Sequence, residues 1–178
     1  MKLKEGSVGD PDIYLGAKFK KVQMSNDVWC WSLSPSKYVH EAVRNCHNHL
    51  KENYYGEYEL ISNAPNPFPL GYEPDIYVSP LLSPEEAYYY QNIIGVMRWM
   101  VELGHVGIAV EVYQLSFFLS IPRRGHMASA LHIISYLRIK HNYLLVLDPS
   151  YADINLSEFN SDKNCTDFYG DSEEAKPH

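Results

Sequence analysis

The sequence predicts a mostly helical α+β fold that begins with a β-hairpin and ends with a short strand. Apolar residues alternate with a period of two over residues 13–19, which is typical of a half-buried strand. In four later segments apolar residues recur at the three- and four-residue intervals of an amphipathic helix. A proline-rich stretch, residues 56–83, separates the first of these helices from the other three.

Size and composition exclude several classes of protein. The chain has 178 residues, of which 46% are hydrophobic and 21% are charged, a normal balance for a globular protein. Its apolar runs are shorter than the ~18–20 residues of a membrane span, and its first residues lack the apolar stretch of a signal peptide. Three widely spaced cysteines favour a reducing compartment. We therefore expect a cytoplasmic or nuclear protein, not a secreted one, with no membrane partner.

Charge is distributed unevenly along the chain. Fifteen Lys and Arg stand against 22 Asp and Glu, a formal net charge of −7, which argues against a surface that is cationic throughout. Residues 153–178 carry seven acids and two lysines, or −5. Residues 1–21 carry five lysines and three acids, or +2, and residues 123–141 carry four basic residues and no acid. The last of these is the most specific charge feature of the chain.

The hairpin is predicted over residues 13–33. Residues 24–27 (Met-Ser-Asn-Asp) provide the turn, and residues 28–33 form a second β-rich run. Ser34 and Pro35 then supply an N-cap and a proline at the first helical position. The helix that follows has about five turns, and its apolar stripe consists of Val39, Ala42, Val43, Cys46 and Leu50.

A linker is predicted next, over residues 56–83, because this stretch has five prolines and no sustained periodicity. We expect it to be partly extended between two subdomains, anchored by Tyr58, Phe68, Tyr72 and Tyr77. A capping box marks its end: Ser83 caps the next helix, and Glu86 reaches back to the serine amide.

Three helices and a strand are predicted after the capping box. The first helix stops near Gly104, and its apolar face consists of Tyr90, Ile93, Ile94, Met97, Met100 and Val101. The second spans about residues 108–119. The third spans about residues 123–140, with a stripe of Met127, Ala130, Leu131, Ile134 and Leu137. Residues 143–147 are predicted to form a strand, and the acidic remainder is expected to be irregular.

The sequence contains no complete active site. Residues 10–12 (Asp-Pro-Asp) follow a glycine and are typical of a turn, with a two-carboxylate metal site as the less favoured interpretation. Residues 46–49 (Cys-His-Asn-His) contain zinc-type ligands, but no second pair at the usual spacing completes a four-ligand site. The motifs of nucleophile elbows, phosphate loops, dinucleotide folds and zinc proteases are missing. We expect no catalytic residue, no metal site and no cofactor.

Arg123 and Arg124 are candidate phosphate contacts. Cations at the N-terminus of a helix oppose its macrodipole, by roughly 0.3–1 kcal/mol each when exposed. The same helix end attracts phosphate, which would explain the arginine pair. A plain solvated surface is the alternative.

A series of short motifs begins with Tyr14-Leu15-Gly16, the hairpin and residues 33–39. In their order these motifs resemble the middle of a copia-type retrotransposon reverse transcriptase, and the first of them are similar to the end of the palm and the start of the thumb in that family. The motifs similar to its connection segment, and to the run before its ribonuclease H domain, lie in residues 90–95, 107–108, 122–137 and 168–175.

The resemblance implies a domain organisation. Residues 8–55 would be the end of the palm, with the hairpin that grips the primer and a thumb-like helix. Residues 56–83 would be the proline-rich linker, residues 84–150 a connection-like helical segment with a terminal strand, and residues 151–178 an acidic tether. The carboxylates that bind Mg²⁺ in the parent enzyme would lie outside this chain, which therefore lacks both catalytic centres.

The function implied is that of a fragment of an RNA-directed DNA polymerase, inactive alone, which supports primer–template binding. Tyr14 and Gly16 would line the primer path, and the phosphate contacts would be Lys18, Lys20, Lys21, Arg123 and Arg124. Its partners would be an RNA–DNA or DNA duplex, bound weakly and without sequence preference, and the remainder of the Pol polyprotein.

A second hypothesis comes from a different class of protein. The chain would be a non-catalytic helical interaction module, or a domesticated relic, that packs against another protein through its exposed aromatic residues. An autonomous enzyme is the least supported interpretation, because the metal-binding carboxylates of a polymerase or nuclease are missing from the sequence.

Overall fold

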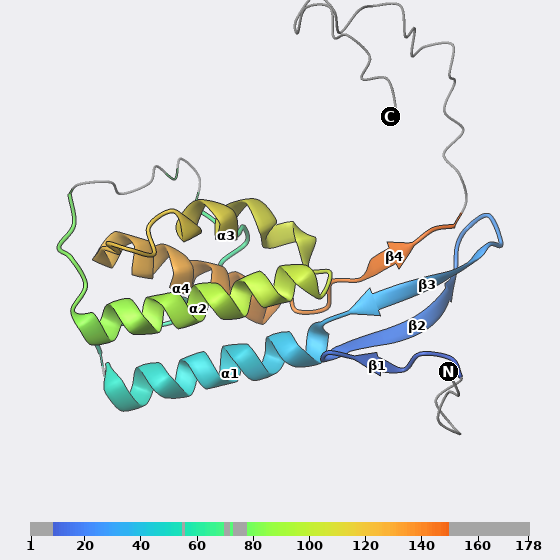
Figure 1. Ribbon diagram of the computed structural model, residues 1–178, viewed down its shortest axis with the longest axis horizontal. Coiled ribbons are helices and arrows are strands. Elements are labelled where there is room, and N and C mark those ends of the chain that lie inside the picture. The colour runs from blue at the N-terminus through green and yellow to red at the C-terminus, as the bar shows by residue number, and fades with distance from the viewer. Residues whose placement is uncertain (1–8, 55, 70–71, 73–77, 150–178) are drawn as a thin grey trace, which may run out of the picture. The chain divides into compact units, whose positions relative to one another are not determined.

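The computed structural model describes residues 9–54, 56–69, 72 and 78–149. These residues form four α-helices, a short 3₁₀ turn and a four-stranded antiparallel sheet, so the α+β class is confirmed (Figure 1). The described residues up to Asp148 group into one compact unit, and the predicted acidic tether lies outside the described residues. None of the described helices is long and apolar enough to cross a membrane.

The N-terminal strands form a three-stranded meander, not a single hairpin. They are β1 (Ile13–Tyr14), β2 (Ala17–Gln23) and β3 (Trp29–Ser34). The β2–β3 hairpin turns at residues 24–28, close to the predicted position. The prediction of one strand over residues 13–19 was wrong, because Leu15 and Gly16 form a two-residue turn between β1 and β2.

The Leu15–Gly16 turn has the geometry of a tight hairpin. Both residues have positive φ, 53° and 97°, as a type I′ turn requires. Glycine adopts this conformation without a steric penalty, whereas leucine rarely does. The alternation of apolar residues continues through the turn, but not all of these residues are buried. Ile13 and Leu15 are exposed, and Ala17 is buried.

A fourth strand, β4 (Leu145–Leu147), returns from the end of the helices to pair with β3. The pairing is antiparallel, with Leu33 opposite Leu145 and Trp31 opposite Leu147, and the sheet order is β1-β2-β3-β4. The strand was predicted from its composition. Its partner was not, because pairing between distant segments leaves no local signal in the sequence.

Helix α1 (Ser36–Asn53) follows β3 directly. Its N-cap is Pro35, not the predicted Ser34, because Ser34 still belongs to β3 and pairs with Lys18 of β2. The predicted apolar stripe is confirmed. Val39, Val43, Cys46 and Leu50 are buried, and Ala42 packs against the same core.

Helix α2 (Pro84–Glu102) begins at the predicted capping box. The Ser83 hydroxyl accepts a hydrogen bond from the Glu86 N–H at 3.2 Å, and the Glu86 carboxylate accepts one from the Ser83 N–H at 2.7 Å. The phenol of Tyr58 donates a third hydrogen bond to this carboxylate, at 2.8 Å. Burial alone would raise the pKa of Glu86, but these hydrogen bonds lower it, so the buried carboxylate stays ionised.

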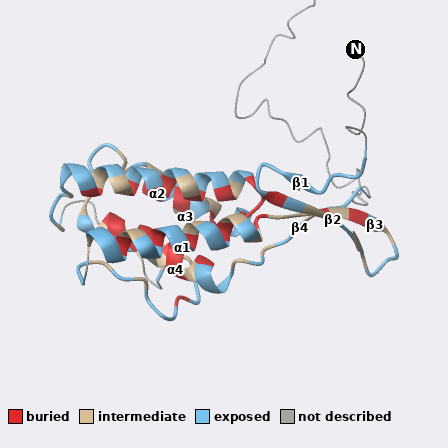
Figure 2. Cartoon of the chain, turned by 90° about the horizontal axis from the view of Figure 1, so that it is seen from below, coloured by how far each residue is buried: buried red, intermediate tan, exposed pale blue. Residues whose placement is uncertain are grey.

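The remaining helices are a 3₁₀ turn, η1 (Val106–Ile108), α3 (Ala109–Ser116) and α4 (Arg124–Ile139). The helix predicted over about residues 108–119 corresponds to α3 and is shorter than expected. Helix α4 agrees to within one residue at each end with the helix predicted over about residues 123–140. Figure 2 shows the buried residues on the sides of the helices that face one another. The predicted stripes of α2 and α4 are buried, apart from the partly exposed Val101.

The described part of the proline-rich segment packs against the helices. Ile61 donates its N–H to the Ser135 hydroxyl at 3.1 Å, and its carbonyl accepts a hydrogen bond from Arg138 at 2.7 Å. Tyr58 and Phe68 contact the core to which all four α-helices contribute. The helices on the two sides of the predicted linker thus share one hydrophobic core. Tyr77 lies outside the described residues.

Replacing Ser83 with alanine should destabilise the protein through loss of the α2 cap. We expect the free energy of unfolding to fall by about 1 kcal/mol, measured from the urea midpoint at constant m-value. Ser25→Ala in the exposed β2–β3 turn is the control and should change the stability by less than about 0.5 kcal/mol. Equal effects of the two substitutions would contradict a specific role for the capping box.

Candidate functional site

The three lysines predicted as phosphate contacts are divided between two faces of β2. Lys18 and Lys20 share a face, because alternate residues of a strand point the same way. Lys21 points to the other face, where its ammonium group lies 2.9 Å from the Asp10 carboxylate and 4.8 Å from the centre of the Trp31 ring. Lys21 is therefore partly neutralised, and Lys18 and Lys20 form the exposed cationic pair.

A groove of about 650 Å³ is lined by Lys18, Lys20 and the first half of α1. The other residues that line it are Ser34, Ser36, Lys37, His40, Glu41, Arg44, Asn142 and Leu144. The groove thus has four cationic side chains, those of Lys18, Lys20, Lys37 and Arg44, and one anionic side chain, that of Glu41. Its formal charge is +3, in a chain whose net charge is −7. We call this surface the basic groove.

The N-terminus of α1 adds to the positive potential of the basic groove. No side chain caps this end of the helix, and its first turn contains no acidic residue. Ser36 and Lys37, which lie in that first turn, both line the groove. Because a helix N-terminus carries a partial positive charge, it reinforces the attraction of the lysines and the arginine for an anion.

Two histidines lie together beside the groove. The ring centres of His40 and His141 are 3.9 Å apart, and the Ser36 hydroxyl lies 3.1 Å from Nδ1 of His141. Burial, and then the neighbouring His40, lower the pKa of His141 below its ordinary value of 6.5. His141 is therefore uncharged at neutral pH and acquires a positive charge only in more acidic solution.

Arg123 and Arg124 do not line the basic groove. The guanidinium group of Arg123 donates a hydrogen bond to the carbonyl of Ser79, and that of Arg124 forms a 2.8 Å ion pair with Glu57. The N–H donors at this end of α4 also have partners, since Gly125 donates to the Ser79 hydroxyl at 3.0 Å and Arg124 to the Pro80 carbonyl. These contacts provide a structural reason for the arginine pair.

Tyr14 and Gly16 lie at the β1–β2 turn and also do not line the basic groove. Tyr14 is exposed. Gly16 is exposed as well, and its positive φ of 97° suits its place in the turn.

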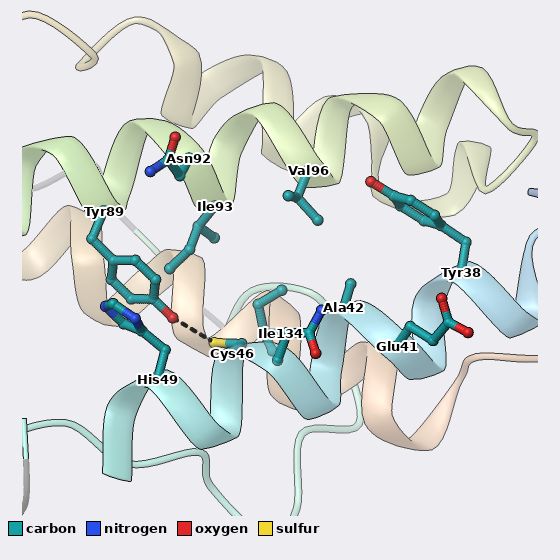
Figure 3. Close-up of a pocket in the computed structure, with 11 residues that line it drawn as sticks. Tyr38, Glu41, Ala42, Cys46, His49, Tyr89, Asn92, Ile93, Val96 and Ile134 are labelled. Carbon is teal, nitrogen blue, oxygen red and sulfur yellow. Dashed lines mark hydrogen bonds between the residues drawn. The ribbon is translucent and has the colours of Figure 1, made fainter. Parts of the chain in front are cut away.

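A second cleft, of about 320 Å³, lies between α1 and α2 (Figure 3). The Tyr89 hydroxyl donates to the Cys46 thiol at 3.2 Å, and the ring of His49 stacks on Tyr89 with 3.9 Å between centres. Burial raises the pKa of Cys46, although the hydrogen bond from Tyr89 opposes this change. The thiol is therefore protonated at neutral pH and is not an activated nucleophile.

The described residues show no group of three or more His, Cys, Asp or Glu side chains that could hold a metal ion. Of the zinc-type ligands in residues 46–49, Cys46 is buried and His47 is exposed. Comparisons of the chain with protein-family models, curated proteins and solved structures find no match. The basic groove is therefore the feature on which a functional argument can be built.

Sequence reasoning found half of the cations in this groove. Lys18 and Lys20 were among the phosphate contacts that the resemblance implies, whereas Lys37 and Arg44 were not predicted as contacts. A usable signal was present, because Lys37, Glu41 and Arg44 recur at helical spacing and form a second stripe on α1. What could not be predicted was that this stripe adjoins β2.

The low pKa of His141 makes stability depend on pH. The unfolded chain takes up this proton at a higher pH than the folded chain, so the free energy of unfolding should fall as the pH is lowered from about 7 to about 5.

His40→Gln removes the neighbouring ring and should raise the pKa of His141, as measured by NMR titration. His47→Gln on the exposed side of α1 is the control. An unchanged His141 titration in His40→Gln would contradict coupling between the two rings.

Proposed function

We propose that the protein binds the phosphate backbone of an RNA–DNA or DNA duplex, as a non-catalytic part of a retrotransposon reverse transcriptase. The observation that carries this proposal is the basic groove, in which Lys18, Lys20, Lys37 and Arg44 come together on an acidic protein. Arginine and lysine side chains supply most phosphate contacts in complexes with nucleic acids.

The spacing of these cations suits a polyanion better than a single small anion. Lys18 and Lys20 are two residues apart on a strand, or about 6.6 Å along its axis. Lys37 and Arg44 are seven residues apart on a helix, or about 10 Å along its axis. Because each strand of a duplex carries one charge per ~3.4 Å of helix axis, the two pairs can follow two or three successive phosphates.

The groove lies between the two segments that the resemblance relates to a primer-gripping hairpin and to part of a thumb. Lys18 and Lys20 belong to the hairpin that would grip the primer strand, and Lys37 and Arg44 belong to the thumb-like helix. The proposal thus keeps the reverse transcriptase interpretation but moves part of the phosphate contact from Arg123 and Arg124 to α1. The remainder of the Pol polyprotein would supply the catalytic carboxylates.

Binding through this groove should be weak, independent of sequence and strongly dependent on salt. Each cation that contacts a phosphate releases about one counterion, and so contributes about one unit to the slope of log affinity against log salt. We expect measurable binding of a short RNA–DNA hybrid by fluorescence anisotropy at about 50 mM salt, and loss of most of it by about 200 mM.

Single substitutions test which cations make these contacts. Lys20→Ala and Arg44→Ala should each weaken binding and reduce the salt slope by about one unit. Matched controls are Lys51→Ala, at the far end of α1, and Arg124→Ala, whose partner is Glu57. Absence of binding at low salt would refute the proposal, and a loss confined to Arg124→Ala would return the contact to α4.

A further inference from the structure

Helix α3 is apolar on two sides. Its inner side, with Val112 and Leu115, is buried in the core. Its outer side carries Val110 and Tyr113 and is continued by Phe117, the C-cap of the helix; the three are about two-thirds exposed, at 66%, 66% and 65%. A surface helix normally has one apolar stripe facing the core, so the second stripe needs its own explanation. Contiguous apolar residues at the surface are typical of an interaction site.

A groove of about 360 Å³ lies beside this outer stripe. It is lined by the facing residues of α2 and α3, which are Arg98, Val101, Glu102, Ala109, Val112, Tyr113, Ser116 and Phe117. The rings of Tyr113 and Phe117 pack edge to face with 4.8 Å between centres, so they form one aromatic pair at its wall. We call the groove and the stripe of Val110, Tyr113 and Phe117 together the α3 face.

Two opposite charges line the α2 side of this face. Arg98 and Glu102 are four residues apart on one helix, both exposed, and neither forms an ion pair with another described residue. When two copies of such a surface face each other about a two-fold axis, the cation of each copy can lie opposite the anion of the other. The surface is therefore electrostatically complementary to a second copy of itself.

We propose that the α3 face pairs with the α3 face of a second copy of the chain about a two-fold axis. The aromatic pair of each copy enters the groove beside the aromatic pair of the other. Arg98 of each copy then lies against Glu102 of the other, which gives two equivalent ion pairs. Aromatic residues and arginine are enriched in protein interfaces, and a two-fold interface uses the same patch on both copies.

The charges of the face favour a second copy of the chain over a polyanion. A phosphate backbone or an anionic membrane would be repelled by Glu102 as strongly as it is attracted by Arg98. The α3 face also shares no residue with the basic groove, so this inference stands apart from the proposed function. A dimer formed in this way would carry two basic grooves.

The mass of the full chain in solution tests the proposal. We expect sedimentation velocity at about 100 µM to show a species of twice the chain's 20.5 kDa. Phe117→Asp should raise the dissociation constant at least tenfold, because it places a charge in the aromatic pair that the proposed dimer would bury. Tyr88→Asp is the matched control, since Tyr88 is equally exposed, at 67%, on α2 but lies outside the α3 face.

Exchanging the two charges tests the geometry of the pairing. Arg98→Glu alone and Glu102→Arg alone should each weaken self-association, because like charges then meet twice. Mixing these two variants should restore a dimer that contains one chain of each, because opposite charges again face each other in both pairs. Phe117→Asp and both charge variants should retain the wild-type far-ultraviolet circular dichroism, since the altered side chains are exposed.

Three results would overturn the proposal. A wild-type chain that is monomeric at about 100 µM would show that the α3 face does not bind a second copy, and would favour a different protein as the partner. A Phe117→Asp chain that dimerises as the wild type does would place the interface elsewhere. Failure of the mixed charge variants to associate would exclude the two-fold pairing of Arg98 with Glu102.

Discussion

The pairing of β4 with β3 is the interaction on which the rest of the described structure depends. It brings the chain that leaves α4 back to the strand that leads into α1, so that His141 meets Ser36, and Asn142 and Leu144 line the basic groove. The end of α2 fits into the same junction: at Gly104, with φ 99°, a Cβ atom would lie 3.4 Å from side-chain atoms of both strands. Without this pairing the groove would lose one of its sides.

The chain separates its charges in space as well as in sequence. Three basic residues that the sequence analysis singled out lie outside the groove, and each has a partner. Lys21 pairs with Asp10, Arg124 pairs with Glu57, and Arg123 donates a hydrogen bond to the carbonyl of Ser79. The basic residues inside the groove face a single carboxylate, Glu41. Such local concentration of positive charge on an acidic protein attracts an anion to one surface. Whether a basic residue is available for binding thus depends on its neighbours in the fold.

The elements that sequence predicted correctly are those whose signals are local. The capping box at Ser83, the stripe of α1 and the bounds of α4 follow from spacing within a few residues. The turn at Leu15 was missed because its apolar side chain continued the alternation of the flanking strands. The groove was predicted only in part, since Lys18 and Lys37 become neighbours through tertiary packing, which spacing along the chain does not encode.

The distance along the chain between the two sides of the groove has a consequence for folding. Ser36 and His141 are 105 residues apart, so their contact requires the closure of a long loop. The conformational entropy of this loop must be lost before the contact can stabilise the folded state. The β1–β2–β3 meander can form early from local turns, but β3 then presents an unpaired edge until β4 arrives. An exposed strand edge can pair with another chain. Late synthesis or loss of Leu145–Leu147 would therefore leave a template for aggregation.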